Sequence, residues 1–137
     1  MSAVLGIDPG MRKAGYALVL QDGSVAERGI EAVDDLFAAM SLLVERNRVD
    51  VLAMGGGTNA ARVTAYLAPL GLPVYLVDER ETTLHARRLY YAENKPTGLQ
   101  RLLPSGLRFP PRPIDDYAAE IIARRWLARK GKRQGPS

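Results

Sequence analysis

The sequence contains no cysteine and only one histidine. Without cysteine, disulfide scaffolds and cysteine-based zinc sites are excluded, and one histidine cannot build a histidine-rich metal site. Any bound metal must therefore be held by oxygen atoms. No apolar run approaches the roughly 20 residues that a membrane-spanning helix needs, and the N-terminus has no basic lead-in to a signal peptide. We therefore expect a cytoplasmic protein that does not enter a membrane.

The length and composition favour one compact domain. The 137 residues are 47% hydrophobic, which is enough for a real core, and we expect that domain to cover residues 1–130. Residues 131–137 are basic and contain glycine and proline, which predicts a disordered tail.

Charge is distributed unevenly along the chain. Residues 1–79 hold six Lys/Arg and ten Asp/Glu, whereas residues 80–137 hold thirteen Lys/Arg and five Asp/Glu. A basic part beside an acidic part is typical of a protein that binds a polyanion next to a carboxylate cluster. A basic tail that only keeps the protein soluble would give a similar pattern.

Hydrophobic periodicity and turn residues predict an α/β fold. Strands are expected at 3–8, 14–20, 25–30, 50–54 and 73–77, and helices at 34–47, 59–68, 82–91 and 115–127. Asp34 or Asp35 could cap the first helix, and Thr58 or Asn59 the second. The proline-rich stretch 94–113 predicts a long mobile loop. This order predicts a mixed five-stranded sheet flanked by helices, with strands 1–3 antiparallel and strands 1, 4 and 5 parallel.

Three carboxylates are expected to converge at one edge of that sheet. Asp8 ends the first strand and Glu79 follows the fifth, and the carboxyl ends of parallel strands form sites. Asp115 begins a helical stripe that continues with Ala118 and Ile122, so it should face the sheet, whereas Asp116 should face water. Closely spaced carboxylates raise one another's pKa, and a divalent cation relieves that conflict. Oxygen ligands favour Mg²⁺ or Mn²⁺, which activate water in phosphodiester cleavage.

Each of these residues also has an ordinary structural interpretation. Asp8 could be a turn aspartate before proline and glycine, Glu79 a surface partner of a nearby arginine, and Asp115 a helix cap. The triple glycine at residues 55–57 could cradle a phosphate at a helix N-terminus, or simply form a tight turn. His85 is interpreted as an exposed helix residue.

Basic residues follow the carboxylates and could hold the phosphates of a nucleic acid. The candidates are Arg12, Lys13, Arg80, Arg87, Arg88, Lys95, Arg101, Arg108 and Arg112. Such contacts supply affinity rather than sequence preference. Tyr16, Tyr90, Tyr91 and Phe109 could stack on bases or pack in the core.

The chain resembles the YqgF/RuvX family of the ribonuclease H-like superfamily, whose members are described as Holliday junction resolvases. Three motifs in order carry the match, over nearly the whole chain. They are Gly6-Ile7-Asp8-Pro9-Gly10 with Arg12-Lys13 and Gly15, Asp78-Glu79-Arg80 with Thr82-Thr83 and Ala86, and Ile114-Asp115 with Ala118-Ala119 and Ile121-Ile122.

The resemblance implies a ribonuclease H-like fold and an endonuclease dependent on Mg²⁺ or Mn²⁺. It assigns the catalytic and metal-ligating carboxylates to Asp8, Glu79 and Asp115. Family members are also linked to processing of the ribosomal RNA precursor. Resolvases of the RuvC type carry a glutamate at the end of the fourth strand, where this chain reads Leu52-Ala53-Met54-Gly55, and the stretch after that strand is shorter than is usual in the family.

We therefore expect a nuclease that acts on branched DNA or precursor ribosomal RNA, as a monomer or homodimer. The alternative is a ribosome-assembly factor that grips RNA with little or no cleavage. A nucleotide-binding lobe of the actin and sugar-kinase type shares the first motif, but such proteins clamp the nucleotide between two lobes and this chain has length for one.

Overall fold

The computed structural model describes residues 2–96, 98–104 and 110–133. The strands are β1 (Ala3–Asp8), β2 (Lys13–Leu20), β3 (Val25–Ala32), β4 (Val49–Gly55) and β5 (Val74–Val77). The helices are α1 (Val33–Arg46), α2 (Ala60–Leu67), α3 (Thr82–Glu93) and α4 (Asp115–Arg133), with 3₁₀ helices η1 (Ala68–Leu70) and η2 (Gly98–Leu102). Over these ranges no helix is both long and apolar enough to cross a membrane.

The five strands form one mixed sheet in the order β3-β2-β1-β4-β5. The first three strands pair antiparallel, and β4 pairs parallel with β1 and with β5. A helical connection precedes each parallel strand, because a parallel pair cannot be joined by a hairpin. The predicted α/β class and strand directions are confirmed, and the carboxyl ends of β1, β4 and β5 meet at one edge.

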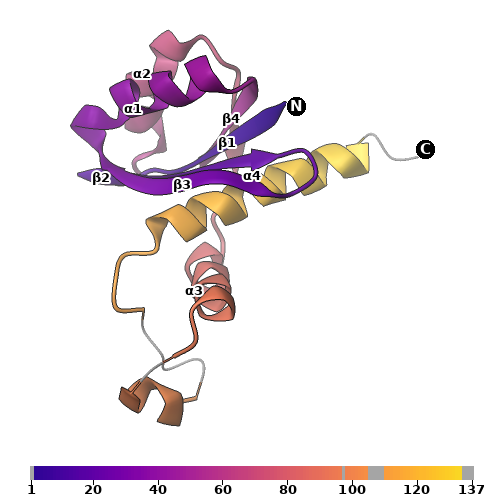
Figure 1. Cartoon of the computed structure of the whole chain (residues 1–137). Coiled ribbons are helices and arrows are strands. Elements are labelled where there is room, and N and C mark those ends of the chain that lie inside the picture. Colours follow the sequence, from indigo (N-terminus) through magenta and orange to yellow (C-terminus); the bar gives the residue numbers. More distant parts are fainter. Residues whose placement is uncertain (1, 97, 105–109, 134–137) are drawn as a thin grey trace.

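Alternation along β1 decides which helices each side chain meets. Ala3, Leu5 and Ile7 pack in the core formed with α1 and α2, whereas Val4 packs in a second core with α4. Successive strand residues point to opposite faces, so Asp8 belongs to the α4 face. Figure 1 shows α1 and α2 on one side of the sheet, α4 on the other, and α3 projecting beyond α4.

Two glycines allow α4 to lie directly on the sheet. A Cβ at Gly6 would stand 2.3 Å from the backbone oxygen of Ala119, and a Cβ at Gly15 would stand 2.0 Å from the backbone oxygen of Asp115. Neither distance is tolerable against backbone atoms. Because Gly15 pairs with Asp8 across the β1–β2 ladder, this close approach brings the first residue of α4 to the end of β1.

The caps and ends of the helices differ in part from the predicted ones. α1 begins at Val33 after Ala32, without a side-chain cap, so Asp34 and Asp35 lie in its first turn, where carboxylates favour the helix dipole. Asn59 precedes α2 but makes no capping hydrogen bond. α4 continues to Arg133, six residues beyond the predicted end, so residues 131–133 are helical rather than part of a disordered tail.

The stretch predicted as a long loop contains η2, and part of it, with the last four residues of the chain, lies outside the described residues. α3 and α4 are joined by a third core, in which Tyr90 and Tyr117 meet edge to face with ring centroids 5.6 Å apart. Tyr90 is thus a packing residue rather than an exposed platform for a base.

Candidate active site

Asp8 stands where the sheet, α4 and the β5–α3 turn meet. It is the last residue of β1, it is half-buried, and it shares the α4 face with Val4 and Gly6. Tight burial of the preceding residues fixes the direction of its side chain, because a one-residue shift would turn the apolar side chains of β1 out of their cores. Asp8 therefore ends a strand with its side chain on the α4 face, rather than serving only as a turn aspartate before proline and glycine.

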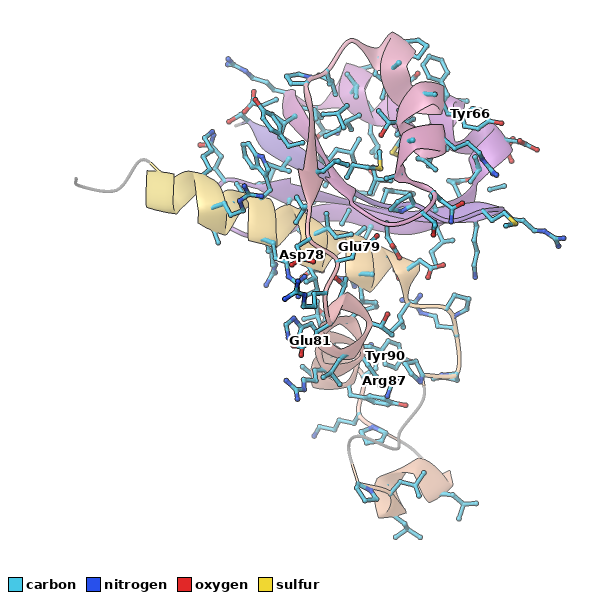
Figure 2. The ribbon with its side chains drawn as sticks, turned by 180° about the vertical axis from the view of Figure 1, so that it is seen from behind. Tyr66, Asp78, Glu79, Glu81, Arg87 and Tyr90 are labelled. Carbon is cyan, nitrogen blue, oxygen red and sulfur yellow. The ribbon has the colours of Figure 1, made fainter. Side chains whose placement is uncertain are left out.

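Glu79 lies in the turn between β5 and α3, which hydrogen bonds hold in place. The Thr82 backbone N–H and hydroxyl both donate to the carbonyl oxygen of Glu79, at 2.9 and 2.6 Å. The guanidinium of Arg125, from α4, donates to the carbonyl oxygen of Asp78 at 2.7 Å and to the Thr82 hydroxyl oxygen at 3.2 Å. Figure 2 shows Asp78 and Glu79 at this junction, above α3. The arginine next in sequence, Arg80, pairs with Asp78 rather than Glu79.

The glycines at the end of β4 make room for the Glu79 carboxylate. A Cβ at Gly55 would lie 2.2 Å from Glu79 Oε1, and a Cβ at Gly57 would lie 2.4 Å from Oε2. The Glu79 side chain therefore covers the end of β4, on the α4 face that it shares with Asp8. The stretch also turns as considered from the sequence, because the Ala60 backbone N–H donates to the carbonyl oxygen of Gly57 at 3.1 Å.

Asp115 is the first residue of α4 and lies at the same edge, on the face of the sheet that α4 covers. Its carboxylate lies 3.5 Å from the Lys13 ammonium of β2, and it is one-third exposed. Asp115 therefore faces the site at the end of β1, with an accompanying positive charge.

Burial and neighbouring carboxylates perturb Asp8 and Glu79. Burial, then the charges of Asp115 and Glu79, raise the pKa of Asp8 from 3.8 to about 7. Burial, then the charge of Asp78, raises the pKa of Glu79. Burial is the larger cause of both shifts, and neighbouring negative charge adds to it. A perturbed carboxylate at a sheet edge is the kind of group that functional sites contain.

The donor atoms fit a hard divalent cation in their chemistry, because all of them are carboxylate oxygens with a charge that a cation would offset. Among the described residues, however, no group of three or more His, Cys, Asp and Glu side chains is arranged to hold a metal ion. Asp8, Glu79 and Asp115 are close enough to shift a pKa, but they do not form a coordination shell in this arrangement.

The prediction that Asp116 faces water is wrong. Asp116 is 6% exposed, and it forms ion pairs with Arg28 at 3.6 Å and Arg112 at 3.2 Å. On the same helix face, Glu120 is fully buried and lies 2.6 Å from Arg28. Arg28 extends from β3, an outer strand of the sheet, and pairs with both acidic side chains. This face of α4 is therefore covered by the sheet. Helix periodicity alone could not reveal that partner.

The predicted nucleic-acid-binding residues fall into different settings. Arg12, in the turn after β1, and Lys13, which begins β2, are exposed, and Arg62 of α2 donates a hydrogen bond to the Met11 carbonyl oxygen in the same turn. Arg112 stacks over the Tyr117 ring, 5.2 Å from its centroid, in addition to pairing with Asp116. The remaining described candidates lie on the turn after β5, α3 or the segment beyond it, and Arg108 lies outside the described residues. They are Arg80, Arg87, Arg88, Lys95 and Arg101.

Comparison with known proteins shows the family to which the chain belongs. A curated protein of Coxiella burnetii strain RSA 331 named "Putative pre-16S rRNA nuclease" is 31% identical to this chain over 139 aligned residues, covering 90% of each. The protein of the same name from Coxiella burnetii strain Dugway 5J108-111 matches at the same identity and coverage. The chain belongs to the YqgF family.

Solved structures support the same fold. The Thermus thermophilus RuvC structure in complex with a Holliday junction matches this YqgF-family chain with a TM-score of 0.59, at 19% identity, over 98% of this chain and 97% of RuvC. The RuvC structure described without a junction gives the same TM-score and identity. RuvC has the ribonuclease H-like fold, and the predicted fold is thereby confirmed. A scan against protein-family models found no match.

Two features around the candidate site of this YqgF-family chain were not predicted from the sequence. Arg125 anchors the turn that carries Glu79, although it lies 46 positions further along the chain. It also lies 2.9 Å from His85 Nδ1, so His85 is bound within the α3–α4 contact rather than simply exposed. The basic run near the end of α4 was the available signal, but it did not distinguish Arg125 from its neighbours.

Proposed function

We propose that this chain is a divalent-metal-dependent endonuclease that hydrolyses phosphodiesters in structured RNA, with precursor ribosomal RNA as the substrate class. The observation that carries the proposal is the placement of Asp8, Glu79 and Asp115 at one edge of the sheet, with the exposed Arg12 and Lys13 in the turn after β1. The raised pKa of Asp8 accords with it. The naming of curated relatives at 31% identity supports the RNA substrate.

Each residue has a role in this proposal. Asp8, Glu79 and Asp115 are the residues that would hold Mg²⁺ or Mn²⁺, and a cation bound there would activate water and offset the charge on the leaving oxygen. Arg12 lies exposed beside Asp8 and binds a substrate phosphate. Lys13 orients Asp115 through the 3.5 Å ion pair.

Binding a cation would require the carboxylates to rearrange, because among the described residues no group of three or more His, Cys, Asp and Glu side chains is arranged to hold a metal ion. Glu79 has the freedom to do so: its carboxylate lies over Gly55 and Gly57, which present no side chains. The carboxylate can therefore move across the end of β4 without a steric barrier from these positions. Its backbone stays fixed by Thr82 and by Arg125 at the neighbouring residue.

The test is cleavage of a precursor 16S rRNA fragment in Mg²⁺ and in Mn²⁺, with a four-way DNA junction in parallel. Wild type should cut the RNA, and Asp8→Asn should lower the rate by at least about a hundredfold, since general acid–base and metal contributions of that order are lost. RNA cleavage unchanged by Asp8→Asn would refute the assignment. Cleavage of the junction alone would refute the RNA substrate while leaving the nuclease activity in place.

A second candidate is an RNA-binding ribosome-assembly factor with little or no cleavage. The lack of a preformed metal-binding group among the described residues favours it. It predicts salt-sensitive RNA binding that Asp8→Asn leaves intact, together with no cleavage by wild type. Measuring binding and cleavage on the same RNA separates the two candidates.

A further inference from the structure

A shallow cavity opens at the edge of β5, away from the three carboxylates. It has a volume of about 130 Å³ and is lined by Tyr75, Leu76, Trp126, Arg129 and Lys130. β5 is an outer strand of the sheet: it pairs with β4 on one side, and no strand of the described residues pairs with its other side. Aromatic, aliphatic and basic side chains thus meet on a surface that the described part of the chain leaves open.

The aromatic pair in this cavity presents a face to solvent. Tyr75 and Trp126 have ring centroids 5.7 Å apart and planes tilted by 46°. Trp126 also packs on the α4 core, whereas Tyr75 is 45% exposed. A tilted pair with one ring anchored in the core and the other open can receive a flat ring by stacking.

The charge around the pair is of one sign. Lys130 Nζ lies 5.3 Å from the Trp126 ring centroid, and Arg129 is exposed beside it. None of the lining residues carries a carboxylate. Residues 121–137 contain six Lys/Arg and no Asp/Glu. A protein surface that combines aromatic rings with uncompensated cations complements a base followed by a phosphate.

The cavity is connected to the carboxylates through two elements. Tyr75 and Val77 point to the α4 face of β5, and the chain reaches Glu79 two residues after the strand ends. Trp126 follows Asp115 by eleven residues on α4, which corresponds to about 16 Å at a helical rise of about 1.5 Å per residue. Arg125, next to Trp126 on α4, donates a hydrogen bond to the carbonyl oxygen of Asp78, in the turn that carries Glu79. A polynucleotide strand crossing the carboxylates can therefore reach the cavity along α4.

We propose that this cavity is a subsite for single-stranded RNA, in which a base stacks on Tyr75 and Trp126 while Arg129 and Lys130 bind the adjoining phosphates. The subsite rests on the proposed function and extends it, because it assigns a place to the unpaired part of the substrate. The base is held by stacking and the phosphates by charge, so the subsite selects single strands without selecting a sequence.

The experiment measures binding of a fluorescein-labelled oligoadenylate RNA of about twelve nucleotides, within the range of roughly 4 to 16 nucleotides typical of single-strand sites. EDTA is present so that metal-dependent cleavage does not intervene. Tyr75→Ala should weaken binding by roughly 5- to 150-fold, the loss expected for one stacked base. Tyr75→Phe should retain wild-type affinity, because the ring remains.

Two further variants separate stacking and charge from general damage. Lys130→Gln should flatten the dependence of log affinity on log salt by about 0.7, the value for one phosphate contact on a single strand. Tyr66→Ala is the matched control, because Tyr66 of α2 is 44% exposed, almost the same as Tyr75. Its substitution should leave RNA affinity unchanged.

The outcomes distinguish this inference from the proposed function. If wild type binds the RNA and Tyr75→Ala binds within twofold of it, the subsite is refuted. The subsite is also refuted if Tyr75→Ala changes the oligomeric state but not RNA affinity, since the cavity would then be a contact between copies. Wild type that cleaves a structured precursor without binding oligoadenylate refutes the subsite alone. Wild type that neither binds nor cleaves any RNA refutes both.

Discussion

Replacing Asp8 with asparagine should stabilise the metal-free protein at neutral pH. The Asp8 carboxyl has a pKa of about 7 in the folded protein, against 3.8 as its ordinary value. Between about pH 4 and about pH 7, the folded state therefore holds a proton that the unfolded state has released. For such a group the free energy of unfolding falls as pH rises from about 4 to about 7 and is level above that range.

The size of the effect follows from the shift. Each pKa unit corresponds to about 1.4 kcal/mol, so a shift from 3.8 to about 7 gives roughly 4 kcal/mol at neutral pH. Asparagine has nearly the same shape and carries no charge at any pH, so Asp8→Asn should recover up to that amount. For a domain of this length, roughly 4 kcal/mol corresponds to a rise in Tm of about 10 to 15 °C.

The assay is thermal and urea unfolding of wild type and Asp8→Asn in EDTA, at about pH 4 and about pH 8. The two proteins should differ little at the lower pH, and Asp8→Asn should be the more stable at the higher. Asp22→Asn is the control, because Asp22 is exposed and hydrogen bonds from Ser24 lower its pKa. A stability difference between wild type and Asp8→Asn that is the same at both pH values would refute the argument from burial and charge crowding.

Three other predictions concern the residues that shape the site. Gly15→Ala should destabilise the fold by roughly 3 kcal/mol or more in urea unfolding, because the new Cβ meets the Asp115 backbone and α4 must shift. Gly55→Ala should lower kcat with a free energy of unfolding within about 1 kcal/mol of wild type, because the Cβ meets only the movable end of the Glu79 side chain; unchanged kcat would contradict this. Arg125→Ala should speed amide hydrogen exchange at residues 78–85, because two hydrogen bonds to that turn and the contact with α3 are lost, and Arg125→Lys should restore part of the protection. Exchange unchanged in Arg125→Ala would contradict this prediction, because the turn would then be stable without Arg125.

The topology was predictable because it depends on local patterns. Apolar runs ending at Asp8 and before Asp78, separated by helical periodicity, predict parallel strands whose ends share an edge. The choice of Asp115 over Asp116 as the residue facing that edge also followed from helix periodicity. The fate of Asp116 did not, because its burial depends on Arg28, which lies 88 positions away in sequence on β3.

The sequence by itself determined the order of the elements, the strand directions and the three carboxylates that meet at the sheet edge, since each depends on residues close together in the chain. Only the tertiary structure decided how closely those groups approach. Gly6 and Gly15 let α4 lie against the sheet, and Gly55 leaves space for Glu79. Each of these glycines is required because a Cβ would clash with an atom from a part of the chain distant in sequence. The sequence alone does not show which atom that is.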